Sequence, residues 1–209
     1  MTAAATGRGR IDKRRAILDA AFTVFARRGY AQACVQEIAD VAGVAKPTVY
    51  NHLNDKETLL RHAVEAAAGI VGADCLDAIA GLRDTDADCE AALRASALRM
   101  LKVCNSERAR ALRALTFAQL SAFPDLAETV GERTSRRLAE ALADRLARLT
   151  LAGRLRTDDP QIAAEQFLAL LSGPLEARSH LGTKATPVSE LKVIADAAVR
   201  TFLAAYAAV

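Results

Sequence analysis

Apolar residues recur along the 209-residue chain mainly at spacings of three and four positions. Between residues 11 and 28 they form two adjoining rows, Ile17, Ala21 and Val24 beside Leu18, Phe22 and Phe25. Such spacing places side chains on one face of a helix. Gly29 is expected to end this helix, and Tyr30 to pack back on it. No run of alternating β-branched residues interrupts the pattern, which therefore predicts an all-α fold.

The stretch from residue 35 to 60 predicts two short helices joined by a turn. The first carries an apolar stripe at Val35, Ile38, Ala39 and Ala42. Gly43 supplies the turn, and Val49 and Leu53 of the second helix face inward. The second helix leaves a polar, basic and aromatic set outside: Lys46, Pro47, Thr48, Tyr50, Asn51 and His52. This is the pattern of a helix-turn-helix, whose second helix fits the major groove of DNA.

The remaining chain predicts a longer connecting helix and a helical body. The connecting helix covers about residues 56 to 80 and precedes a polar break at 83 to 90. The body helices are expected at about 90 to 103, 106 to 123, 124 to 152, 160 to 181 and 187 to 208, which brings the chain to about nine helices. Gly153 is expected to end the helix at 124 to 152, and an Asp-Asp-Pro sequence to begin the next helix. Pro174 is expected to bend the helix that contains it.

The last two helices, joined by a short GTKATP loop, are expected to lie antiparallel as a hairpin. They carry more apolar surface than one neighbouring layer needs. This favours a four-helix interface with a second copy of the chain. The alternative is that they are core helices of a monomer.

Charge and hydropathy limit the partners and the location. Residues 1 to 56 carry nine lysines and arginines against five acids, although the whole chain has a net charge of only +3. A basic amino-terminal segment followed by a nearly neutral remainder is expected where one end of a protein binds a polyanion. Residues 1 to 10 are expected to be a disordered basic arm, either a solvated terminus or one that brings Arg8 or Arg10 to DNA. No signal peptide and no apolar stretch of about 18 residues is apparent, which predicts a cytoplasmic protein without a membrane partner.

The cysteines and histidines indicate neither a metal site nor catalysis. Cys34, Cys75, Cys89 and Cys104 are scattered, with no C-x-x-C and no histidine at ligand spacing. Reduced, helix-packed thiols are the favoured interpretation, with a redox sensor at Cys34 as the alternative. No nucleophile signature and no glycine-rich phosphate loop occurs. The chain is therefore expected not to be an enzyme and to need no cofactor.

The order helix, Gly-Tyr and EIADVAGVAKPTVYNHLNDKETLL resembles the DNA-binding domain of TetR/AcrR-type transcriptional regulators, which commonly read G-[VI]-[ST]-x-[GP]-T-[LV]-Y-x-H-F-x-x-K-x-x-L. Ala45 departs from this pattern where a serine or threonine usually caps the recognition helix. Ala33 and Cys34 likewise replace a capping Thr/Ser pair, and losing a cap costs about 0.5 to 2 kcal/mol. The matching residues are Gly43, Val44, Pro47, Thr48, Val49, Tyr50, His52, Lys56 and Leu59. The fold assignment survives these departures, which weaken the expected caps and phosphate contacts and leave the operator affinity open.

The resemblance implies a role for each outward residue of the helix-turn-helix. It implies base-edge contacts for Gln36, Lys46, Pro47, Thr48 and Asn51, and phosphate contacts for Tyr50, His52 and Lys56. The chemistry agrees, because amides can pair with adenine and because hydroxyl, imidazole and ammonium groups suit phosphate oxygens. The alternatives are a partly buried structural ring for Tyr50 and a solvated side chain for His52.

The resemblance also implies an organisation and a function. A three-helix DNA-binding domain at 11 to 55 would precede a ligand-binding and dimerisation domain at 56 to 209, and the homodimer would bind a palindromic operator. An apolar or aromatic effector, whose identity the sequence does not name, would bind a pocket lined by Met100, Leu101, Cys104, Phe117, Leu120 and Phe167. These residues are alternatively plain core. The expected function is a ligand-responsive regulator of double-stranded DNA, more often a repressor.

An enzyme or small-molecule-binding bundle with a vestigial helix-turn-helix is suggested by the missing caps. A sequence-independent architectural DNA protein conflicts with the small net charge, because such binding depends on phosphate neutralisation.

Overall fold

The computed structural model describes residues 3–83 and 88–208, with side chains for 11–82 and 88–208. The predicted disordered arm at residues 1 to 10 differs from the structure, because α1 already begins at Ala3; the side chains of residues 1 to 10 are not described. Most of the predicted polar break at 83 to 90 lies outside the described side chains. The described residues are helical with no strand, which confirms the all-α prediction. None of their helices is long and apolar enough to cross a membrane.

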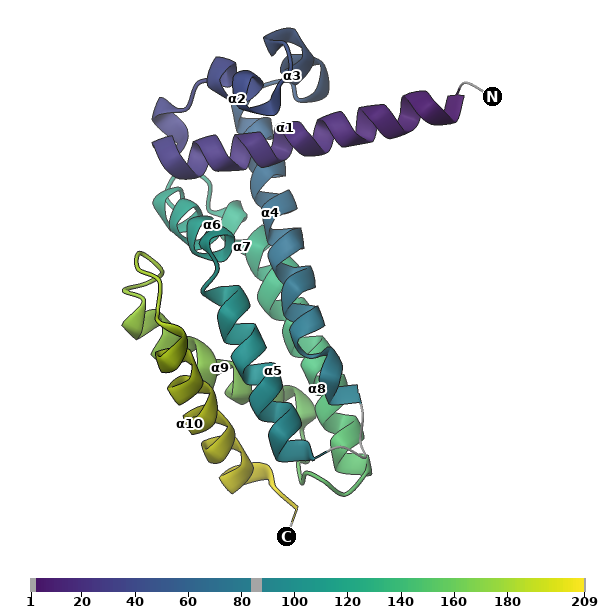
Figure 1. Cartoon of the computed structure of the whole chain (residues 1–209), viewed down its shortest axis with the longest axis vertical. Helices are drawn as coiled ribbons and strands as arrows, with labels where there is room; N and C mark the ends of the chain where they lie inside the picture. The colour runs from purple at the N-terminus through teal and green to yellow at the C-terminus, as the bar shows by residue number, and fades with distance from the viewer. Residues whose placement is uncertain (1–2, 84–87, 209) are drawn as a thin grey trace. The chain divides into compact units, whose positions relative to one another are not determined.

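The helices follow one another along the chain as the hydrophobic pattern predicts (Figure 1). They are α1 (Ala3–Gln32), α2 (Val35–Ala42), α3 (Lys46–His52), α4 (Lys56–Ala78), the 3-10 turn η1 (Ala80–Arg83), α5 (Cys89–Cys104), α6 (Glu107–Ala118), α7 (Asp125–Gly131), the π-helical segment η2 (Glu132–Arg136), α8 (Arg137–Leu151), α9 (Pro160–Arg178) and α10 (Val188–Tyr206). Because α7, η2 and α8 run on without a break, the described residues contain the predicted nine helical stretches.

The chain divides into two compact units, and each unit combines two segments that are separate in the sequence. The first comprises Met1–Gly69 and Leu112–Val130, and the second comprises Ile70–Ala111 and Gly131–Val209. The first unit therefore extends beyond residue 55, the predicted end of the DNA-binding domain, and includes the end of α6 and most of α7. Helices α4 and α6 each contribute residues to both units.

In the first unit, α1 provides the central apolar surface. All six residues of its two predicted rows are buried. They pack with the apolar side of α2, where Ile38 and Ala39 are fully buried. Gly29 breaks the helical geometry of α1 with φ 74°, a left-handed value that side chains other than glycine rarely adopt. The predicted helix end at Gly29 is confirmed, and the turn leads into α2.

In the second unit, the long helices pack in neighbouring pairs. Helix α8 contacts α9, while α10 contacts both α9 and α5. Phe167 of α9 and Phe202 of α10 meet edge to face with ring centroids 4.9 Å apart. The Asp-Asp-Pro start signal is confirmed, because the Asp159 carboxylate accepts hydrogen bonds from the N–H groups of Gln161 and Ile162. Pro174 lies inside α9, which continues to Arg178.

Candidate functional site

The turn between α2 and α3 has the geometry that its glycine predicts. Gly43 has φ 64°, and its N–H donates to the carbonyl of Asp40 at 3.2 Å. The N–H of Val44 donates to the carbonyl of Ala39 at 3.0 Å. These two bonds form a Schellman motif, which satisfies the last carbonyls of α2 and turns the chain toward α3. The predicted helix-turn-helix is therefore present.

Helix α3 is held by two residues and leaves the rest of its surface open. Val49 and Leu53 are buried against the first unit, as predicted. Tyr50 is 43% exposed. The other outward residues are Lys46, Pro47 and Asn51, which are exposed, and Thr48 and His52, which are half-buried. The surface available for contact is thus polar, basic and aromatic.

The two short helices lack side-chain caps, whereas α4 has one. Cys34 and Ala45 occupy the N-cap positions of α2 and α3 with extended backbone, and neither side chain accepts a capping hydrogen bond. In contrast, Asp55 at the start of α4 accepts the N–H of Thr58 at 2.7 Å and its hydroxyl at 3.2 Å. These bonds lower the pKa of the Asp55 carboxyl. The missing caps predicted from Ala45 and Cys34 are confirmed.

Charged contacts hold α2 on the end of α1. Glu37 accepts hydrogen bonds from the guanidinium groups of Arg27 and Arg28, the second at 3.3 Å. Gln36, a predicted base contact, is exposed and donates from Nε2 to Asp40 Oδ1 at 2.8 Å. Its amide is oriented by its own helix and still faces solvent.

Lys56 lies in an aromatic cluster of the first unit. Its ammonium lies 4.8 Å from the centroid of the Tyr30 ring and donates to the carbonyl of Ala31 at 3.1 Å. Tyr30 also contacts Phe25, at 6.0 Å between centroids, and Phe123 edge to face at 5.0 Å. Tyr30 thus packs back on α1 as predicted. Burial, followed by the carboxylates of Glu57 and Asp55, raises the pKa of the Tyr30 hydroxyl.

A hollow of about 460 Å³ opens between the first half of α1 and the end of α3. Ile11, Arg14, Asn51 and His52 line it. The fold thereby brings two predicted DNA contacts together with an arginine 37 positions earlier in the chain, which the motif did not identify. The only sequence signal for Arg14 was its place in a basic cluster near the start of the first helix.

The predicted effector-binding residues fall in both units. Met100, Leu101 and Phe167 are buried in the second unit, and Cys104 is half-buried there. Phe117 and Leu120 belong to the first unit and are 55% and 46% exposed. A hydrogen bond with Cys104, together with burial, raises the pKa of the Cys75 thiol. All four cysteines are free thiols in the structure, and Cys34 is exposed.

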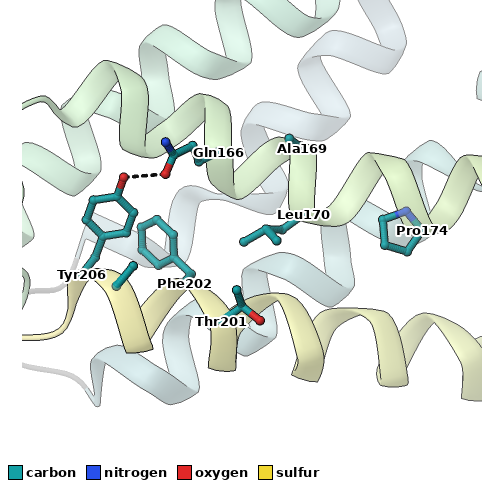
Figure 2. A pocket seen from close by; sticks show the side chains of 8 residues that line it. Gln166, Ala169, Leu170, Pro174, Thr201, Phe202 and Tyr206 are labelled. Atoms are coloured by element: carbon teal, nitrogen blue, oxygen red, sulfur yellow. Dashed lines mark hydrogen bonds between the residues drawn. The ribbon is translucent and has the colours of Figure 1, made fainter.

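The hairpin of α9 and α10 carries a second, apolar groove of about 460 Å³ (Figure 2). At one end the Tyr206 hydroxyl donates to Gln166 Oε1 at 2.6 Å. The remaining lining is mostly small or apolar: Ala169, Leu170, Pro174, Thr201, Phe202 and Ala205. This face offers little for hydrogen bonding, but its small side chains allow another helix to approach closely.

Both halves of the chain match known protein families. Residues 17–63 match the family described as bacterial regulatory proteins, tetR family. Residues 91–208 match the AefR-like transcriptional repressor C-terminal domain. The chain belongs to the TetR family. Its members are transcriptional regulators and not enzymes, so this protein is a DNA-binding regulator, and the alternative of an enzyme with a vestigial helix-turn-helix is not favoured.

Similar proteins extend the TetR match over most of the chain. A TetR-family regulator structure from Mesorhizobium loti is 32% identical, with a TM-score of 0.86 over 95% of this chain and 98% of that one. The flavonoid-responsive regulator FrrA is 27% identical, with a TM-score of 0.73 over 93% of this chain and 97% of its own. The transcriptional repressor Rv1474c of Mycobacterium tuberculosis is 29% identical over 81% of this chain and 83% of its own.

Proposed function

We propose that this TetR-family protein is a cytoplasmic homodimer that represses transcription from a palindromic operator and releases it on binding a small apolar or aromatic molecule. The observation that carries the proposal is the exposed face of α3. Buried Val49 and Leu53 fix this helix, while Lys46 and Thr48 lie in its first turn. In a helix-turn-helix, the N-terminal residues of the second helix meet base edges in the major groove.

Contacts to base and to phosphate have different consequences for binding. Thr48 and Lys46 suit base edges, since a threonine methyl can pack on thymine and a lysine can donate to guanine. The Tyr50 hydroxyl and His52 imidazole suit phosphate oxygens. The first set confers sequence preference, and the second adds affinity for any DNA.

The homodimer is supported by the outer face of the α9–α10 hairpin. The groove lined by Ala169, Leu170 and Ala205 is apolar and has room for side chains of a second copy. Val193, further along α10, is 58% exposed. A two-fold dimer presents two recognition helices to half-sites one or more helical turns apart, so the operator is expected to be palindromic.

Effector response and repression are supported by the relatives and by the apolar body. FrrA is flavonoid-responsive, and Rv1474c is a repressor. Buried Met100, Leu101 and Phe167 are apolar, as the walls of a site for a planar aromatic molecule would be. Helix α4 has residues in both compact units, so a shift of α4 is the route by which an effector changes DNA affinity.

The proposal is tested with the protein's own upstream intergenic DNA. Fluorescence anisotropy at several salt concentrations should show much tighter binding to this fragment than to random DNA of equal length. Addition of flavonoids or other planar aromatic compounds should lower the affinity. Thr48→Ala should reduce the ratio of specific to random binding by about 10-fold, because one base contact is worth about 1 to 3 kcal/mol. Equal affinity for both DNAs would contradict sequence-specific regulation.

A further inference from the structure

We infer that Arg14, Asn51 and His52 form a binding site for one phosphodiester group of the operator backbone. The inference rests on the proposed function and adds two points to it. Arg14 becomes a DNA contact from α1, outside the helix-turn-helix motif. Asn51 becomes a contact to the backbone, although the family pattern had suggested a base contact.

The hollow combines donors from two helices. Ile11 and Arg14 lie one turn apart in the first half of α1, and Asn51 and His52 are the last two residues of α3. None of these four lining residues is acidic. Arg14 has no ion-pair partner among the residues whose side chains are described. The hollow is therefore open to an anion.

The donor set matches a phosphodiester. The Arg14 guanidinium offers a planar fork that fits two non-bridging oxygens, and it cannot accept a hydrogen bond. The Asn51 amide and the His52 ring can add further N–H donors. Ile11 is 71% exposed and supplies an apolar edge, which suits the sugar carbons on either side of the phosphate. A free phosphate ion shares the anionic part of this chemistry but lacks the sugars.

The place of Asn51 on α3 supports its reassignment. Base edges are reached from the N-terminal end of a recognition helix. Lys46, Pro47 and Thr48 occupy that end, whereas Asn51 is next to the last residue of α3. Asn51 shares the hollow with His52 and Arg14, so it lies with the phosphate-contacting residues.

Arg15 provides a matched control, because it neighbours Arg14 on α1, is exposed, and does not line the hollow. Arg14→Ala and Arg15→Ala are compared in the full-length protein by measuring operator and random-DNA affinity against salt concentration. Arg14→Ala should weaken both affinities by a similar factor and reduce the salt slope by about 0.9, the value for one phosphate. Arg15→Ala should leave the slope close to that of the wild type. Equal slopes for the two variants would overturn the inference.

A second experiment locates the contact. Neutral methylphosphonate groups are placed one at a time along the operator backbone, and the loss of affinity is measured at each position. At one backbone position in each half-site, the neutral group should weaken binding of the wild-type protein and of Thr48→Ala. Binding of Arg14→Ala and Asn51→Ala should not change at that position. If no position distinguishes Arg14→Ala from the wild type, the contact does not exist.

Two further outcomes separate the possible sources of failure. Asn51→Ala should leave the ratio of specific to random binding unchanged, and a ratio as low as that of Thr48→Ala would restore Asn51 as a base contact.

Inorganic phosphate is titrated while the His52 ring resonances are followed. Saturation by phosphate without any effect of Arg14→Ala on operator affinity would make the hollow a free-anion site. A wild-type protein that binds no DNA would contradict the proposed function. If the wild-type protein binds DNA but Arg14→Ala and Arg15→Ala have the same affinity and salt slope, only this inference is contradicted.

Discussion

The exposed face of α3 and the outer face of the α9–α10 hairpin both present side chains that the fold itself does not need, but their chemistry is opposite. Helix α3 presents an ammonium, a phenol and an amide, whereas the hairpin presents alanines, a proline and apolar side chains around a groove. Nucleic acid is recognised by donors at fixed positions, and a second copy of a chain by close packing. The difference agrees with the proposed partners, which are DNA for α3 and a second copy of the chain for the hairpin.

The two surfaces also differ in how much each residue matters. On α3, under the proposed function, a single exchange is expected to change one hydrogen bond to one group of the DNA. On the hairpin, neighbouring small residues are nearly interchangeable, and only a large or charged side chain disturbs the packing. Substitutions of the two kinds should therefore give effects of different size and type.

The largest effect is expected from Ala169→Arg, which places a charge in the hairpin groove. The protein should become a folded monomer in sedimentation experiments. Operator affinity should fall by about 10² to 10⁴-fold, because the two half-sites are no longer bound together. Lys192→Glu on α10, exposed and outside the groove, is the charge-changing control and should remain dimeric. A dimeric Ala169→Arg protein would remove the hairpin from the interface.

Phe123→Ala tests what supports the DNA-binding surface. The Phe123 ring is 9% exposed, contacts Tyr30 and lies under the Arg61 guanidinium at 5.2 Å. Its removal should lower the free energy of unfolding by about 3 kcal/mol in denaturant titrations. Phe117→Ala, at a position 55% exposed, should change it by less than about 0.5 kcal/mol. Similar losses for both variants would argue against a role of Phe123 in the first unit.

Lys56→Ala is expected to have an intermediate effect. As the predicted phosphate contact, Lys56 should add affinity for every DNA sequence, and its loss should reduce the salt slope by about one. Lys56→Arg should retain both the slope and the contact with Tyr30, since an arginine also packs on an aromatic face. An unchanged slope with lower thermal stability would show that Lys56 acts only through Tyr30 and the Ala31 carbonyl.

The smallest effect is expected from restoring a cap. Ala45→Ser provides a hydroxyl at the N-cap of α3 and should stabilise the first unit by about 1 kcal/mol. Operator binding should tighten as the recognition helix becomes better formed. Ala26→Ser, at an exposed position inside α1 and away from its ends, controls for the new hydroxyl and should not stabilise the protein. Calorimetry of both variants measures the difference.

Much of the fold could be predicted because local rules determine it. Gly29 and Gly43 adopt the positive φ values that end helices, and the spacing of Val49 and Leu53 determines which side of α3 is buried. Each of these inferences needs only residues close together in the chain. The same locality explains why the missing caps at Cys34 and Ala45 could be recognised in advance.

The remaining features depend on contacts between distant residues. Arg14 lines the same hollow as Asn51 only because the fold brings this part of α1 near the end of α3, and no local pattern marks that proximity. Phe117 near the end of α6 and Leu120 in the turn after it look like core residues by composition, yet both are exposed. Hydrophobicity alone does not say which side of a helix or turn is covered. Phe123 likewise carries no sign in the sequence that it packs on Tyr30.

The contact of Phe123 with Tyr30 also matters for building hybrid regulators. Exchanging DNA specificity between relatives is usually imagined as joining one amino-terminal segment to another body. Here a junction at residue 69 would leave Tyr30 and Arg61 facing a foreign loop, without Phe123 and without the Asp125 carboxylate that pairs with Arg61. A transplanted head should therefore be accompanied by residues 112–130, so that a working chimera of this protein needs two exchanged segments.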